Sequence, residues 1–360
     1  MNFELAYIGN KGTHVFAGNG PAYNTNEPAI GPGVDLGATG FVALPLDPIN
    51  NRRRLFLNGI PAFTAAGESC CSTDVSNYFG NDASSHYNAF QVKVEKRFSQ
   101  GLQLLAHYTY SQAYNYDSNY YSVDNRIAYG PDDFSRNHVW VMSAVYQLPF
   151  GQGKKYLSGV SRPMNFLVGG WQVSNTTNWS GGLPFTATIG ECAHISDVHT
   201  GSGDVDCRPD LLSGQSFSTG KSRDAQGNLR WFTPVAPLSY GPVPATTDAC
   251  TLARPTSGPF VLPACGHIGN AGRNWLRGPH AFFSDLSVAK NFSITERYQA
   301  QFRFDAYNVF NHPVLGFGST QGNTCVDCSG GGIISGIEAD ASPNAPNGMR
   351  QLQFGLRFTF

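Results

Sequence analysis

The chain has 360 residues, a size that fits one large domain or roughly two to three average ones. Lysine and arginine (24) balance aspartate and glutamate (25), so the formal net charge of −1 gives no basic surface for nucleic acid and no charge excess typical of disorder. Charged residues make up only 14% and aromatic residues 13%, and no run approaches the ~18 apolar residues of a spanning helix. This composition favours a β protein.

Four strands are predicted in the first part of the chain, three of them from the alternation of apolar and polar residues. The chain opens inside a strand, because apolar residues recur at every second position from Phe3 to Tyr7. Residues 87–98 and 102–111 alternate in the same way on either side of a short Ser-Gln-Gly turn, which predicts a hairpin. Residues 137–148 predict a further strand with two apolar faces.

Four more strands are predicted in the second part. A turn over residues 149–155 is followed by a strand that starts near Asn165. Residues 282–292 and 298–306 alternate strongly around a turn, and the closing strand covers about residues 352–360.

The connections between the eight predicted strands alternate between short and long. The long ones cover about residues 11–85, 116–136, 190–280 and 311–348, and the first contains a candidate local hairpin at 54–63. Structureless loops of this length count against a compact soluble domain. Short turns on one side and long loops on the other are typical of transmembrane barrels. The sequence therefore predicts an all-β fold, an antiparallel transmembrane β-barrel segment of about eight strands with long extracellular loops.

Charged and aromatic positions agree with a membrane barrel. Lys96 and Lys290 are the clear charges in the lipid-facing rows, and both lie near a short turn, where an ammonium group can snorkel to the interface. A lysine at mid-depth would cost about 2–4 kcal/mol. Four aromatic residues towards strand ends fit an aromatic girdle: Tyr108, Tyr110, Trp140 and Trp179.

The closing strand has one apolar and one polar face. The apolar row ends in Phe354, Phe358 and Phe360, and such a row on a soluble edge strand would promote aggregation. A barrel provides a partner strand and lipid for it; the alternative is the last strand of a soluble sandwich. The polar row continues on the neighbouring strand and predicts a wet lumen or a surface that contacts a plug; the alternative is the solvent face of a sheet. Its members are Gln299, Gln301, Arg303, Asp305 and Arg357.

All eight cysteines fall in the predicted long loops: Cys70, Cys71, Cys192, Cys207, Cys250, Cys265, Cys325 and Cys328. An even number on the side assigned as extracellular suggests disulfides in an oxidising compartment. Equal spacings make Cys192–Cys207 and Cys250–Cys265 candidate pairs, although sequence does not fix the connectivity. A zinc site at Cys325 and Cys328 would need two further ligands that no spacing supplies.

No motif for catalysis occurs, whether a phosphate loop, a dinucleotide fingerprint, His-Glu-x-x-His or Gly-x-Ser-x-Gly. The acidic pair Asp132-Asp133 could bind Ca²⁺ weakly, but a solvated loop is the better interpretation because further oxygen ligands at fixed spacing are missing. The same holds for Asp204 and Asp206. We therefore expect no enzyme, no cofactor and no bound metal.

Several long segments resemble a known family. They are GPDDFSRNHVWVMSAVYQLPFGQGKK, GGWQVSNTTNWSGGLPFTAT, GNAGRNWLRGPHAFFSDLSVAKNFSITERYQAQFRFDAYNVFNHP and the terminal FGLRFTF. In this order, from about Tyr87 to Phe360, they are similar to the C-terminal barrel of TonB-dependent outer-membrane receptors, in particular the Oar-like branch with a carboxypeptidase-regulatory-like domain. The resemblance implies a 22-stranded barrel closed by a plug, uptake energised through the TonB complex, and a terminal aromatic residue that acts as the membrane-insertion signal.

The start of the chain shows no secretory signal, so we expect residues 1–360 to be the C-terminal part of a longer receptor that lacks its plug and TonB box here. The predicted function is ligand capture and uptake in the outer membrane of a Gram-negative bacterium. Expected partners are outer-membrane lipid, the barrel assembly machinery, the TonB complex through the missing N-terminal parts, and an unknown small ligand (a siderophore, oligosaccharide or peptide), but no nucleic acid.

Two alternatives remain. One is an autonomous eight-stranded barrel that acts as an adhesin or surface-binding module. The other is a secreted β-sandwich glycosidase, which would need paired carboxylates. Glu95 and Asp305 are the clearest carboxylates in the strands, and nothing in the sequence indicates that they converge.

Overall fold

The computed structural model describes eleven stretches with side chains, and it gives the backbone of four further short strands. The stretches are residues 1–16, 83–116, 128–188, 208–212, 222–232, 260–261, 269–293, 297–316, 324–326, 330–334 and 348–360, together with the single residues 81 and 336. The four backbone strands are β2 (Ala22–Tyr23), β3 (Gly33–Asp35), β4 (Phe41–Ala43) and β5 (Tyr78–Phe79). The predicted hairpin at 54–63 lies outside these ranges.

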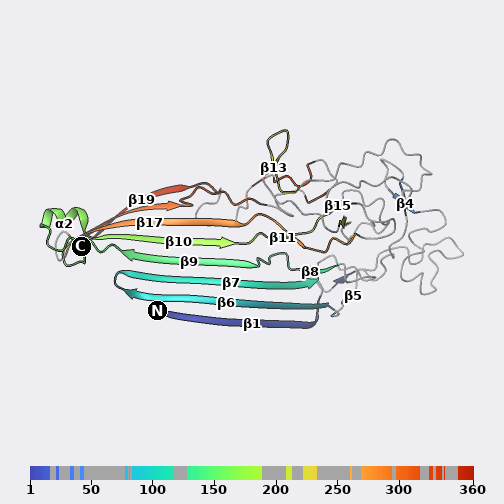
Figure 1. The fold of residues 1–360 in the computed structure, drawn as a ribbon, viewed down its shortest axis with the longest axis horizontal. Coiled ribbons are helices and arrows are strands. Elements are labelled where there is room, and N and C mark those ends of the chain that lie inside the picture. The colour runs from blue at the N-terminus through green and yellow to red at the C-terminus, as the bar shows by residue number, and fades with distance from the viewer. Residues whose placement is uncertain are drawn as a thin grey trace.

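One antiparallel sheet dominates the molecule, and its long strands follow one another in chain order (Figure 1). They are β1 (Asn2–Val15), β6 (Ala83–Ser99), β7 (Leu102–Tyr116), β9 (His138–Gln147), β10 (Trp171–Ser180), β17 (Ala281–Ser293), β18 (Gln299–Tyr307) and β19 (Gln351–Thr359). All eight predicted strands are present. A short strand, β8 (Tyr129–Pro131), adds to the end of β7.

The register aligns the apolar rows of all the strands into one continuous face. Leu5 lies opposite Val92, Val92 opposite Tyr108, and Tyr108 opposite Trp140. At the other edge, Val288 lies opposite Phe304, which lies opposite Phe354. Because side chains alternate across a strand, the other face collects mainly polar residues. The sheet therefore has one face suited to lipid and one suited to water, as the sequence predicted.

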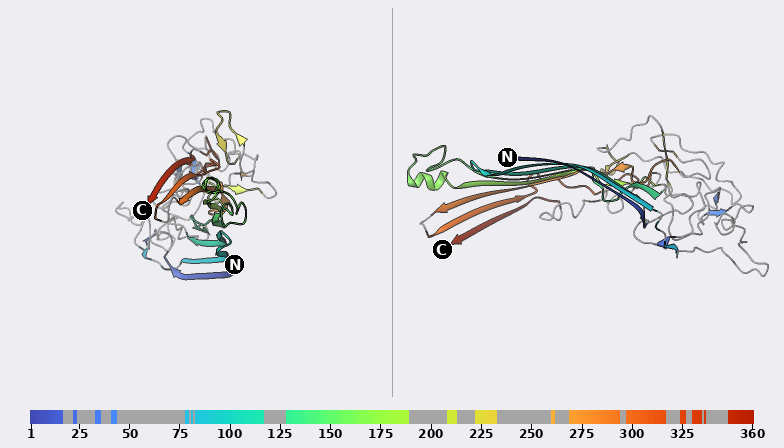
Figure 2. Two further views of the ribbon diagram at one scale, coloured as in Figure 1. Left: turned by 90° about the vertical axis from the view of Figure 1, so that its left-hand side faces the viewer. Right: turned by 90° about the horizontal axis from the view of Figure 1, so that it is seen from below.

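The sheet is open between its first and last strands. Within the described part of the chain, β1 pairs only with β6 and β19 only with β18, and the two edge strands do not pair with each other. The end-on view in Figure 2 shows β1 and β19 far apart at opposite sides of the molecule. Each edge therefore presents a row of backbone donors and acceptors that can take a further strand.

The two ends of the sheet differ in the length of their connections. At one end β6 turns directly into β7 through Gln100 and Gly101, both with positive φ (52° and 80°), the backbone twist that suits a two-residue hairpin. The connection with helix α2 (Arg162–Val168), residues 148–170, lies at the same end as this turn, whereas the other long connections lie at the opposite end (Figure 1). They contain the small strand pairs β11 (Pro184–Phe185) with β16 (Leu276–Arg277), β12 (Asp210–Leu211) with β15 (Phe260–Val261), and β13 (Ser222–Arg223) with β14 (Leu229–Arg230).

The segment around Asn165 is a helix, not the start of a strand as predicted. Helix α2 covers Arg162–Val168, and β10 begins only at Trp171. Pro163 sits in the first helical turn, where its fixed φ and missing N–H are tolerated. No helix in the described residues is long and apolar enough to span a membrane.

The Lys290 side chain also departs from the prediction. Lys290 is buried, with 3% of the residue exposed, and its ammonium group donates to the carbonyl of Gly169 at the end of α2. The ammonium lies 5.3 Å from the Trp171 ring and 5.2 Å from the Phe292 ring. A cation at a helix C-terminus satisfies carbonyls that lack an intrahelical partner. Lys290 is therefore held by α2, and the charge is offset within the protein.

The aromatic residues predicted for a girdle lie together near the loop end. Trp140 is paired with both Tyr108 and Trp179 across neighbouring strands. His138 joins them, because its Nδ1 lies 2.8 Å from the Tyr108 hydroxyl and its ring lies 5.0 Å from that of Tyr110. Amphipathic rings at this level match a membrane–water interface.

Candidate functional site

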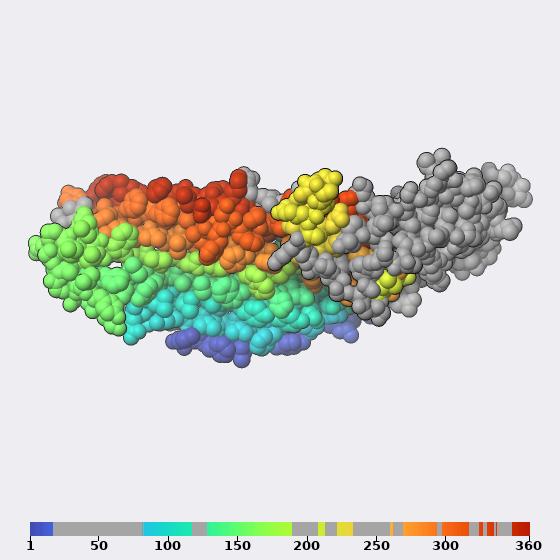
Figure 3. Space-filling model, turned by 45° about the horizontal axis from the view of Figure 1, so that its top comes forward, coloured from blue at the N-terminus to red at the C-terminus, as the bar shows by residue number. Residues whose placement is uncertain are grey.

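The long connections converge at the end of the sheet opposite α2. We use the name loop base for the described residues there that join strands to loops, namely 128–137, 181–188, 269–280 and 308–316. Figure 3 shows the hairpin of β13 and β14, in yellow, projecting from this end of the molecule. Loops positioned by a rigid scaffold often carry binding residues, so the loop base is the candidate site.

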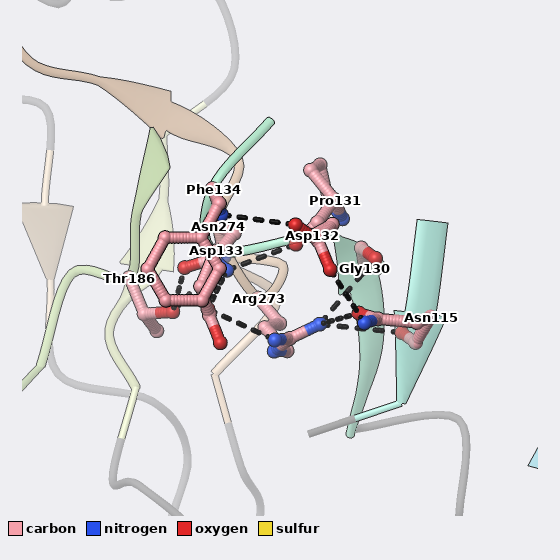
Figure 4. Close-up of polar contacts among 9 residues, drawn as sticks. All are labelled: Asn115, Gly130, Pro131, Asp132, Asp133, Phe134, Thr186, Arg273 and Asn274. Atoms are coloured by element: carbon pink, nitrogen blue, oxygen red, sulfur yellow. Dashed lines mark hydrogen bonds and ion pairs between the residues drawn. The ribbon is translucent and has the colours of Figure 1, made fainter. Parts of the chain in front are cut away.

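Arg273 lies at the centre of the loop base, with its side chain 1% exposed. Its guanidinium donates to the side-chain and backbone oxygens of Asn115, at 2.9 and 3.2 Å, and to Asp133 Oδ1 at 2.9 Å (Figure 4). A buried charge is tolerated when it is both paired and hydrogen-bonded, and Asp133 supplies the opposite charge. One side chain thus joins the end of β7, the turn after β8 and the segment before β16.

Asn274 adds a second set of bonds beside the guanidinium. Its side-chain amide donates to the Pro131 carbonyl at 2.9 Å and to the Asp133 carboxylate, and its backbone N–H donates to the Thr186 hydroxyl oxygen at 2.9 Å (Figure 4). Asn274 has a φ of 53°, a left-handed conformation that asparagine accepts more readily than most residues. Asn274 therefore joins the segment before β9, which contains Pro131, to the segment after β10, which contains Thr186.

Asp132 fixes the turn itself, and Gly130 makes room for Arg273. The Asp132 carboxylate accepts from Asn115 Nδ2 at 2.7 Å and from the N–H of Phe134 at 3.0 Å. A Cβ on Gly130 would lie 2.5 Å from the Arg273 carbonyl oxygen, so only glycine permits this approach. The prediction of a solvated acidic pair holds for Asp133, whose side chain is 57% exposed, but both carboxylates also hold the loop base together.

Two further arginines bind backbone oxygens next to this cluster. Arg277 donates to the Ser135 carbonyl and, at 2.7 Å, to Asn137 Oδ1, while Arg136 donates to the Gly181 carbonyl at 2.8 Å. Burial lowers the pKa of Arg277, but a guanidinium starts so far above neutrality that it keeps its charge. These bonds tie the entry into β9 to the exit from β10.

An apolar cluster packs above the arginines. Its buried members come from six of the described stretches: Phe185, Ala187, Phe232, Phe260, Leu276, Val326 and Ile334. The Phe232 ring lies 6.2 Å from that of Phe185 and 5.7 Å from that of Phe260. The Trp231 indole donates to the Arg277 carbonyl at 2.8 Å and so links this cluster to the polar layer. Parts of the long loops therefore have a small core of their own.

Asn308 closes the other side of the loop base. It is 1% exposed, its N–H donates to Asp285 Oδ1 at 2.8 Å, and its side-chain amide donates to the carbonyls of His312 and Gly348, at 3.0 and 2.8 Å. One asparagine thus joins β17, the end of β18 and the segment that leads into β19.

The loop base is a set of hydrogen bonds and ion pairs that hold loop segments together, which we call latches, and it is not a reactive centre. The carboxylates and amides named above bind one another and backbone groups across segments that are far apart in the sequence. Among the residues that the structure describes, no three His, Cys, Asp or Glu side chains gather as they would for a metal ion. These bonds can hold the loop base rigid. A rigid loop base lowers the entropy cost of binding a ligand there.

The residues predicted for the lumen lie together. Gln301 is opposite Arg357, and Arg303 is opposite Gly355, which leaves space for the arginine side chain. Arg303 Nε lies 2.8 Å from Asp305 Oδ2. Gln299 and Asp305 continue the same row on β18, opposite Thr359 and Gln353. Glu95 is on β6, next to Lys93 at 3.3 Å, so the two strand carboxylates considered for a glycosidase lie on different, non-adjacent strands.

The predicted insertion signal lies at the exposed edge. Phe354 and Phe358 belong to the apolar row of β19, and Phe360 follows the strand. Of the eight cysteines, only Cys325 falls within the described residues, and its thiol is not free. The proposed pairs Cys192–Cys207 and Cys250–Cys265, and the remaining cysteines, lie outside the described part and stay predictions.

Sequence reasoning missed Arg273, Asn274 and Asn308. The available signal was their position, since GRNW lies in the segment before the strand predicted at 282–292 and NVFNHP directly follows the strand predicted at 298–306, both in segments quoted for the resemblance. Binding residues lie disproportionately on loops that a rigid scaffold positions. Their partners carry no sequence signal, because Asp133 lies 140 residues from Arg273 and Thr186 lies 88 residues from Asn274.

A single antiparallel sheet with one lipid-type face, short turns at one end and long loops at the other defines a membrane β-barrel protein. A family model described as an outer membrane beta barrel domain matches residues 1–353. The chain belongs to this family, and its location is the outer membrane of a Gram-negative bacterium. Searches of curated proteins and of solved structures gave no match.

Proposed function

We propose that the chain is the C-terminal part of a TonB-dependent receptor barrel of the Oar-like type, in which the latched loops help to capture a small ligand for uptake. In this proposal the work is binding and gated passage, without bond chemistry. The TonB complex would act through N-terminal parts that precede these residues in the longer chain.

The open sheet is the observation that carries the proposal. An eight-stranded barrel closes only if its first and last strands pair, and the described β1 and β19 each have a single partner. In hydrocarbon each backbone group without a partner costs several kcal/mol. The nine residues of β19 would therefore not remain an edge in a membrane, and further strands are the natural partners. Larger barrels also have the lumen that a plug and a ligand require.

The polar face supports the same proposal. Lys93 bridges Glu4 and Glu95, each at 3.3 Å, and the Arg303–Asp305 pair lies on the same face near the other edge. Charges of both signs arranged along the strands suit a wet lumen that contacts a polar plug surface.

The test is the size of the polypeptide in native outer membranes, read by immunoblot with an antibody against residues 190–280. The proposal predicts a band far above 38.9 kDa, the mass of these residues alone. A band at 38.9 kDa in that fraction would contradict it and would favour an autonomous barrel that acts as an adhesin or surface-binding module.

A further inference from the structure

A basic, aromatic hollow lies at the short-turn end of the sheet, beside α2. Its volume is about 580 Å³, and it opens between the β6–β7 turn and the segment after β9. The residues that matter here are Lys154 and Lys155, with the rings of Phe98, Tyr146 and Tyr156. Tyr146 lies in the apolar row, opposite Leu102 and Val173, so the hollow is on the lipid side of the sheet.

Lys154 and Lys155 are the charged residues among those that line this hollow. Residues 148–180 contain Lys154, Lys155 and Arg162 and no aspartate or glutamate. Both lysines are exposed, and the Lys155 ammonium lies 5.3 Å from the Tyr156 ring. A cluster of cations next to a membrane surface attracts anionic headgroups, by about 1 kcal/mol for each Lys or Arg.

Helix α2 extends the apolar face beyond the strands. The Phe166 ring packs 4.7 Å from that of Phe292, which belongs to the lipid-facing row of β17. Leu167 is 66% exposed, and Met164 and Phe166 are also exposed, although all three are apolar. Exposed apolar side chains on a helix that is continuous with a lipid-facing row are typical of an interfacial helix.

The helix is fixed to the sheet in this position. Asn165 Oδ1 accepts from the N–H of Gln152 at 2.7 Å, and the Trp171 indole donates to the Leu167 carbonyl at 3.0 Å. Lys290 donates to the Gly169 carbonyl, so side chains satisfy two carbonyls at the C-terminal end of the helix. The hollow and the helix are thus built as one rigid surface at the membrane boundary.

We propose that this surface binds an anionic phospholipid of the periplasmic leaflet, with its phosphate at Lys154 and Lys155 and its acyl chains along α2 and the apolar row. Short turns are periplasmic in outer-membrane barrels, which places the hollow at that leaflet. The aromatic rings suit the region between headgroup and acyl chain, where amphipathic rings are enriched. The proposal depends on the barrel family alone and not on TonB-dependent uptake.

Fluorescence quenching by brominated lipids tests the site. The whole polypeptide that carries these residues is purified from outer membranes and reconstituted with brominated phosphatidylglycerol or brominated phosphatidylcholine. Trp171 lies next to the hollow, because its carbonyl accepts from the N–H of Leu148 in the wall of the hollow. Subtracting the quenching of a Trp171→Phe variant isolates the fluorescence signal of Trp171. The expected result is a preference for the anionic lipid of up to roughly 30-fold at low salt, which corresponds to about 1 kcal/mol for each of two lysines.

The variants decide whether the two lysines cause the preference. Lys154→Gln/Lys155→Gln should bring it close to one, and because both side chains are exposed the fold should not change. Lys11→Gln/Arg223→Gln removes two exposed positive charges at the opposite end and should keep the preference. Raised salt should weaken it in the wild type. Equal quenching by both lipids, or a preference that survives in the double-lysine variant, would overturn the proposal.

Discussion

The two ends of the sheet are held together in different ways. The loop end contains Arg273, Asn274 and Asn308, whose buried side chains connect segments far apart in the sequence. The turn end has a tight hairpin and the short helix α2, which the cation of Lys290 joins to β17. Hydrogen bonds are stronger in the protein interior because the dielectric constant there is low. A surface next to lipid is stabilised more by apolar side chains. The difference is consistent with the proposals that a ligand binds at the loop end and a lipid at the turn end.

Removing the aromatic residue at the turn end should have the largest effect. Phe360→Ser should abolish assembly into the outer membrane, because the family resemblance implies that this residue is the insertion signal. Phe360 is 87% exposed, so the substitution removes no packing contact of note. The readout is the amount of protein in washed outer membranes. Phe134→Ser, which changes an equally exposed phenylalanine of the loop base, is the control, and normal levels of the Phe360 variant would refute the role.

Arg273→Met should loosen the loop end most strongly. The change leaves Asn115 and Asp133 without their charged partner and should destabilise the local structure by about 2–4 kcal/mol. Hydrogen exchange of amides in residues 128–137 is the measurement, and faster exchange is expected there while β17 stays protected. Arg97→Met removes an arginine that is 85% exposed and should change exchange by less than ~0.5 kcal/mol. Equal effects of the two variants would show that Arg273 is not a latch.

Gly130→Ala tests the same latch from the backbone side. The new Cβ would meet the Arg273 carbonyl at 2.5 Å, and such overpacking costs about 1–3 kcal/mol. Gly159→Ala is the matched control, because a Cβ there has nothing within 4 Å. Proteolysis of intact cells should cleave the loops faster in the Gly130 variant alone. Equal cleavage of the two variants would mean that the loop base accommodates the added Cβ at position 130.

Lys290→Met should have the smallest effect and should stay at the turn end. Without the ammonium, α2 loses the bond to the Gly169 carbonyl, and we expect about 1–2 kcal/mol less protection of amides 165–169. The barrel should still assemble, since methionine suits a lipid-facing row. Lys96→Met, in the same row but on β6, should leave α2 unchanged. Unaltered protection in the Lys290 variant would show that the helix is held by its other contacts.

The sequence was most informative where neighbours along the chain decide the structure. Alternation in β6, β7, β17 and β18 needs only a period of two, and it predicted both the strands and their faces. Helix α2 was missed because seven residues are too few for a clear helical period, although Pro163 and the following Gly169-Gly170 were boundary signals. The position of Lys290 under α2 could not follow from either segment alone.

The candidate site could be predicted only in part. The lumen row followed from alternation, since Gln301, Arg303 and Asp305 occupy every second position. The latches did not, because Arg273 meets Asp133 across 140 positions and Asn274 meets Thr186 across 88. Such pairs arise when the strands bring distant loops to one end of the sheet, and a single sequence carries no record of that contact.

The most direct test of the open sheet is disulfide cross-linking between its two edges in native outer membranes. Cysteines at Glu4 or Ala6 of β1 are combined with cysteines at Gly355 or Arg357 of β19, all on the polar face. Gln301→Cys/Arg357→Cys, which lie opposite each other on β18 and β19, is the positive control. We predict that the control pair cross-links and that no pair joins β1 to β19. An efficient link between β1 and β19 would mean that eight strands close on themselves, and the receptor account would be wrong.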